Sequence, residues 1–151
     1  MVQITLTEQQ IKLLSKELLK VGVNIDKRPI TERIKTFKDA LELYEGDVEG
    51  KIFLLNYSGD DKDILASVAF LKLSIIIEVL NEGWTPDWDN DNEYKYYTYF
   101  DMRNNTLVFD DCFDYWHTPS GNGSRLCLKT SALAEYCGKQ FIDLYKQLMI
   151  K

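Results

Sequence analysis

The stretch DILASVAFLKLSIIIEVLN, residues 63–81, decides the fold of this chain. Its apolar residues cover nearly every side of a helix, and a helix that is hydrophobic all round is normally buried. The stretch also falls short of the roughly 20 apolar residues that a membrane span needs. We therefore expect a buried central helix and no membrane segment. Its few polar interruptions are Ser67, Lys72, Ser74 and Glu78.

The sequence before this helix predicts smaller elements. Apolar residues at helical spacing follow Thr7, a good N-cap, and Gly22 is placed to end that first helix. The spacing returns over Thr31–Tyr44, which predicts a second helix. Lys51–Tyr57 contains a short apolar run and is predicted to be a short strand or a loop.

After the central helix the composition becomes aromatic and β-branched. Residues 93–111 have the pattern of an antiparallel hairpin that turns near Asn104 and Asn105. A short strand over Arg125–Lys129 and a helix over Thr130–Met149 are expected to follow. We thus predict a single α+β domain over residues 1–151, with a buried central helix, amino- and carboxy-terminal helices, and a small antiparallel sheet.

Charge and cysteine content limit the class of protein. The net charge is −6, and residues 61–92 carry seven acidic and two basic side chains. Because this segment would repel a phosphate backbone, direct nucleic-acid binding is not expected. Cys112, Cys127 and Cys137 are odd in number and form no CxxC pair, and the first residues lack a secretion signal. We expect a protein of a reducing cytoplasm, with its oligomeric state left open.

Three blocks of sequence carry a family resemblance: NEGWTPDWDNDNEYKYY at 81–97, GSRLC at 123–127 and AEYCGKQFIDLY at 134–145. In this order they resemble a family of small uncharacterised proteins of Bacteroidetes bacteria, their phages and mobile elements. The resemblance covers roughly the carboxy-terminal half of the chain. It implies an origin and no activity, and a phage setting favours an inhibitor or modulator of a host protein, or a virion accessory component.

Four alternating acids, Asp87, Asp89, Asp91 and Glu93, resemble the start of a calcium-binding loop. That loop needs Gly at its sixth position, where Asn92 stands, and a Glu at its twelfth, which is absent here. The acids would otherwise be solvent-exposed turn residues. A calcium or magnesium site at these four residues, extended by Asp101 or Asp110, is therefore the alternative hypothesis.

The hairpin region carries many aromatic side chains and an excess of acids. We expect Tyr94, Tyr96 and Phe100 to pack under the helices, which leaves Tyr97 and Tyr99 on the other face of the sheet. That face is predicted either to bind a protein or to be covered by the amino-terminal helices. The candidate binding surface comprises Trp84, Trp88, Tyr97, Tyr99, Asp110, Asp111, Asp114, Trp116 and Arg125.

No set of nucleophile, base and cofactor-binding residues stands out. His117 is the only histidine, and a pairing with Cys112 lacks an orienting third residue. We therefore predict a non-enzymatic module without a cofactor that binds a host or virion protein through the acidic, aromatic surface. The alternatives are a divalent-metal-dependent enzyme or metal-stabilised module, and a structural component of a virion.

Overall fold

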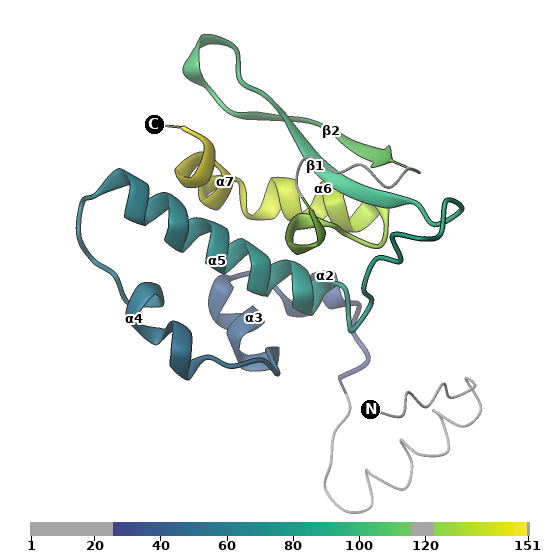
Figure 1. Cartoon of the computed structure of the whole chain (residues 1–151), viewed down its shortest axis with the longest axis horizontal. Coiled ribbons are helices and arrows are strands. Elements are labelled where there is room, and N and C mark those ends of the chain that lie inside the picture. The colour runs from purple at the N-terminus through teal and green to yellow at the C-terminus, as the bar shows by residue number, and fades with distance from the viewer. Residues whose placement is uncertain (1–25, 116–122, 151) are drawn as a thin grey trace, which may run out of the picture.

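The computed structural model describes residues 26–115 and 123–150, and its centre is the helix α5 (Lys62–Leu80). Asp61 caps this helix, because its Oδ1 accepts hydrogen bonds from the main-chain N–H groups of Asp63 and Ile64, each at 3.0 Å. Leu73, Ile76 and Leu80 of α5 are fully buried. The predicted central helix is confirmed, and Figure 1 shows it running through the middle of the molecule.

The predicted second helix is two helices. They are α2 (Ile30–Arg33) and α3 (Phe37–Leu43). The break arises at Thr36, whose hydroxyl accepts the N–H of Asp39 while the Asp39 carboxylate accepts the N–H of Thr36 at 2.8 Å. This capping box starts a new helix where periodicity alone predicted a continuous one. The helix predicted between Thr7 and Gly22 lies outside the described residues.

The strand prediction for Lys51–Tyr57 is wrong. This segment forms part of a 3-10 turn, Glu49–Lys51, and a single helical turn, α4 (Ile52–Leu55). A run of four apolar residues carries no periodicity that separates strand from helix. In the described structure the only sheet is the later hairpin, so this segment has no neighbouring strand to pair with.

The predicted hairpin is confirmed. Strand β1 (Lys95–Asp101) pairs antiparallel with β2 (Val108–Tyr115), and the register shifts between Tyr99 and Phe100. The turn contains the 3-10 segment Arg103–Asn105, where Asn104 has φ 57°. Asn tolerates this left-handed conformation better than most residues, which explains a turn at this point.

The carboxy-terminal part is more broken than predicted. Residues 124–126 form a 3-10 turn, and only Leu128 makes a bridge, exchanging main-chain hydrogen bonds with Tyr96 at 2.9 and 3.1 Å. The predicted strand Arg125–Lys129 is therefore reduced to one residue. The predicted final helix is interrupted at Phe141, which separates α6 (Ser131–Gln140) from α7 (Ile142–Met149).

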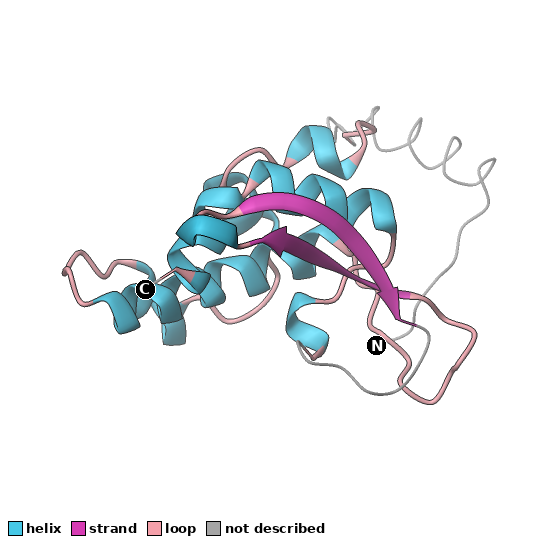
Figure 2. Ribbon diagram, turned by 90° about the horizontal axis from the view of Figure 1, so that it is seen from above, coloured by secondary structure: helices cyan, strands magenta, loops and turns pink. Residues whose placement is uncertain are grey.

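The elements form a helical layer with the hairpin across it. Helix α5 packs against α3 on one side and α7 on the other, while α6 lies under both strands. Figure 2 shows the strands curving over the helices. Gly138 of α6 permits the close approach, since a Cβ there would lie 2.6 Å from a Phe109 ring carbon. Within the described residues, no helix combines the length and apolar character that crossing a bilayer requires.

Candidate functional site

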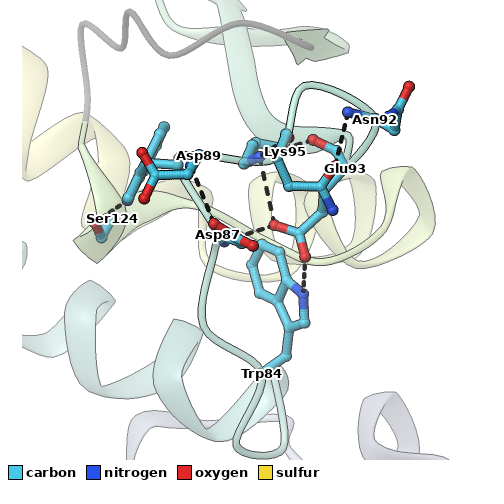
Figure 3. A network of polar contacts seen from close by, with 9 residues as sticks. Trp84, Asp87, Asp89, Asn92, Glu93, Lys95 and Ser124 are labelled. Atoms are coloured by element: carbon cyan, nitrogen blue, oxygen red, sulfur yellow. Dashed lines mark hydrogen bonds and ion pairs between the residues drawn. The ribbon is translucent and has the colours of Figure 1, made fainter.

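The acidic loop between α5 and β1 is organised around Lys95, the first residue of β1. Only 3% of Lys95 is exposed. Its Nζ donates to the main-chain carbonyls of Asn90 and Glu93 at 3.0 and 2.9 Å, and lies 3.4 Å from Glu93 Oε1. The same ammonium stands 5.7 Å from the centre of the Trp88 ring. The chain thus supplies its own cation to the acidic loop, as Figure 3 shows.

Glu93 and Ser124 hold the two tryptophans of this loop in place. Glu93 Oε2 accepts the indole N–H of Trp84 at 3.3 Å, and Glu93 Oε1 accepts the main-chain N–H of Asp87 at 2.7 Å. The indole N–H of Trp88 donates to Ser124 Oγ at 3.0 Å. Both indole N–H groups therefore have partners within the chain, as the polar tip of a partly buried Trp requires.

The aspartates of the loop act as turn residues. Asp87 Oδ1 accepts the N–H of Asp89 at 3.0 Å, which is the local bond expected of an Asx turn. Asp87, Asp89 and Asp91 are all exposed. Among the described residues, no group of three or more His, Cys, Asp or Glu side chains is arranged to hold a metal ion. The calcium or magnesium hypothesis stays a prediction, which melting with and without a chelator would test.

A groove of about 1040 Å³ opens beside this loop. One face of α5 lines it, because Phe70, Ser74, Ile77 and Asn81 recur at helical spacing. The other lining residues are Glu78, Gly83, Trp84, Thr85, Pro86, Trp88 and residues 123–125. The structure therefore brings together three residues of the predicted surface, Trp84, Trp88 and Arg125.

Asn81 fixes the walls of the groove relative to each other. Its Nδ2 donates to the carbonyl of Cys127 at 2.8 Å, and its Oδ1 accepts the N–H of Lys129 at 3.0 Å. Only 4% of Asn81 is exposed. The sequence analysis missed this residue, since an Asn at the end of a helix signals no more than a cap. The distant partner segment becomes visible only in the folded chain.

Two charged side chains line the groove, Glu78 of α5 and Arg125 of the 3-10 turn. Neither makes a side-chain hydrogen bond or an ion pair with any described residue. Two nearby lysines do form ion pairs: Lys129 Nζ lies 3.0 Å from Glu82 Oε2, and Lys95 is paired with Glu93. Among the described residues, Arg125 forms no ion pair with an aspartate.

The remaining residues of the predicted surface do not gather at the groove. Tyr97 was placed on a sheet face predicted either to bind a protein or to be covered. Only 6% of it is exposed, and its side chain hydrogen-bonds Cys127. Tyr99, which is 49% exposed, and the exposed Asp110 lie on the hairpin instead. For Asp111 and Asp114 the structure describes only the backbone of β2, and Trp116 lies outside the described residues.

The expected packing of the other hairpin aromatics is partly confirmed. Phe100 and Tyr96 pack against the core, and the Phe100 ring lies 4.7 Å from that of Tyr145. Tyr94 precedes the strand and is 47% exposed, so its predicted burial is wrong. The second face of β1 is covered at Lys95 and Tyr97 by the acidic loop and by the segment around Cys127.

Comparisons with protein-family models, with curated proteins and with solved structures found no match. The groove and its chemistry are therefore the basis for a functional argument.

Proposed function

We propose that this protein is a non-enzymatic protein-binding module that holds a segment of a host or virion protein in the groove beside Trp84 and Trp88. The observation that carries the proposal is the fixing of both indoles through their N–H groups, by Glu93 and Ser124. Rings held in this way present carbon surfaces to the groove without further loss of conformational freedom on binding.

Interfaces draw much of their binding energy from a few aromatic and arginine side chains in well-packed pockets. The groove combines two tryptophans, Phe70 and Pro86 with Arg125 in a single concavity. Its volume suits a short peptide segment with an apolar side chain as the anchor. The proposed binding surface is therefore the groove between α5 and the acidic loop. Tyr99 and Asp110 of the hairpin lie outside it.

A selection from a displayed library of random linear peptides tests this proposal. Enriched peptides are titrated against the parent protein and against Ser74→Arg, which places a long side chain in the groove and changes no residue of the loop. Tyr99→Ala on the hairpin is the matched control. We expect Ser74→Arg to weaken binding by about tenfold or more, equivalent to about 1.4 kcal/mol, and Tyr99→Ala to leave it unchanged.

Two results would overturn the proposal. One is a selection that enriches no peptide, and the other is binding that Ser74→Arg leaves intact. Circular dichroism and thermal melting of Ser74→Arg establish that it is folded, and Phe70→Ala, which removes part of the wall from a partly exposed position, provides a second groove variant.

A further inference from the structure

We infer that the segment bound in this groove carries charges of both signs, with a carboxylate against Arg125 and a basic group against Glu78. The inference rests on the proposed function and names the chemistry of its ligand. It starts from the observation that these two charged lining residues have no side-chain partner among the described residues. By contrast, Glu82, which follows the groove residue Asn81, is paired with Lys129.

Arg125 gives the groove the chemistry of a carboxylate site. A guanidinium offers a planar fork of N–H donors that matches the two oxygens of a carboxylate. Beside it, Ser124 Oγ accepts the N–H of Trp88, so the hydroxyl proton of Ser124 is directed to another acceptor. A carboxylate placed there would take donors from both side chains. It can belong to an Asp or Glu side chain or to the terminus of a chain.

Glu78 gives the groove the chemistry of a cation site. Glu78 stands on the α5 face whose neighbouring groove residues are Ser74, Ile77 and Asn81, and none of these is basic. An ammonium or guanidinium group here would pair with the Glu78 carboxylate and could also lie against the ring face of Trp84. Trp84, Pro86 and Trp88 line the same groove, and their apolar carbons suit an apolar side chain of the bound segment.

Charge reversal tests this inference. The peptides enriched above are expected to carry an acidic and a basic residue together with an apolar one. Arg125→Glu should weaken the binding of such a peptide by about tenfold or more, and a peptide whose acid is replaced by Lys should recover affinity for this variant. Glu78→Lys should show the same behaviour when the basic residue of the peptide is replaced by Glu.

The controls make the same change of charge elsewhere. Glu135→Lys on α6 and Arg103→Glu in the hairpin turn alter exposed side chains outside the groove and should leave binding unchanged. Amidation of the peptide terminus separates the two sources of the carboxylate, because a loss of affinity on amidation identifies a terminal carboxylate and unchanged affinity identifies a side chain. Either result is consistent with a carboxylate at Arg125.

The inference and the proposed function fail in different ways. If peptides bind and Ser74→Arg blocks them, but the charge reversals have no effect, the groove does bind peptides. The charges that we assign to the bound segment at Arg125 and Glu78 are then wrong. If Ser74→Arg has no effect, the groove is not the binding site and both fail. Rescue of both reversed variants by the reversed peptides would support the inference directly.

Discussion

The ammonium of Lys95 donates a hydrogen bond to the main-chain carbonyl of Asn90 at 3.0 Å. A side chain at the start of a strand thereby ties down the loop that precedes it. The acidic sequence of this loop suggests a bound metal ion, but a buried lysine stands among its carbonyl groups and beside its Glu. The loop in turn holds Trp84 and Trp88 at the edge of the groove, so the proposed site depends on one buried cation.

Replacing Lys95 with Met should destabilise the protein by about 2–4 kcal/mol, because it leaves the Glu93 carboxylate and two carbonyls without their buried donor. The free energy of unfolding in urea measures the effect. Lys146→Met on α7 removes a lysine that is 46% exposed and should change this free energy by less than about 0.5 kcal/mol. Equal effects of the two substitutions would contradict the role of Lys95.

Asn81→Ala should cost about 2–3 kcal/mol, because it leaves the Cys127 carbonyl and the Lys129 N–H without partners in a buried place. Hydrogen exchange of the amides around Cys127 should also become faster than in the parent protein. Asn56→Ala, at an exposed position after α4, is the matched control. Unchanged exchange in Asn81→Ala would mean that the amide does not hold the two segments together.

Gly138→Ala should destabilise the protein by about 1–3 kcal/mol through overpacking between α6 and the hairpin. The new methyl group would lie 2.6 Å from a ring carbon of Phe109 and 3.1 Å from Thr98 Cγ2. Phe109→Leu, which shortens the opposing side chain, should reduce that cost in a double-mutant cycle. Additive effects of the two substitutions would show that the Phe109 ring is not what limits the size of residue 138.

The protein should lose stability in alkaline solution. Burial raises the pKa of the Cys137 thiol from 9.0 to about 12. Above about pH 9 the unfolded chain therefore releases a proton that the native state keeps, so the free energy of unfolding falls as the pH rises. Urea unfolding at about pH 8 and pH 10 should show a decrease that is smaller in Cys137→Ala by about 1 kcal/mol. Identical decreases would show that this thiol ionises equally in both states.

The sequence located the principal elements because strong local patterns specify them. An all-round apolar run defines α5, and alternating aromatic residues with an Asn-rich turn define the hairpin. Two helix breaks were missed. One is at Thr36, where a capping box starts a new helix, and the other is at Phe141, where the backbone leaves helical geometry between α6 and α7. The strand predicted over Lys51–Tyr57 failed because four consecutive apolar residues are compatible with either helix or strand.

The candidate site depended more on tertiary structure than the fold did. From composition, the sequence by itself determined that Trp84, Trp88 and Arg125 were candidates for binding. Only the folded chain decided that they meet, because residues 84 and 125 come together through Asn81, Lys129 and the bridge between Tyr96 and Leu128. It also placed Lys95 inside the acidic loop and buried Tyr97. Local patterns reflect forces between neighbours in sequence, whereas contacts between distant segments form only when the chain packs around its core.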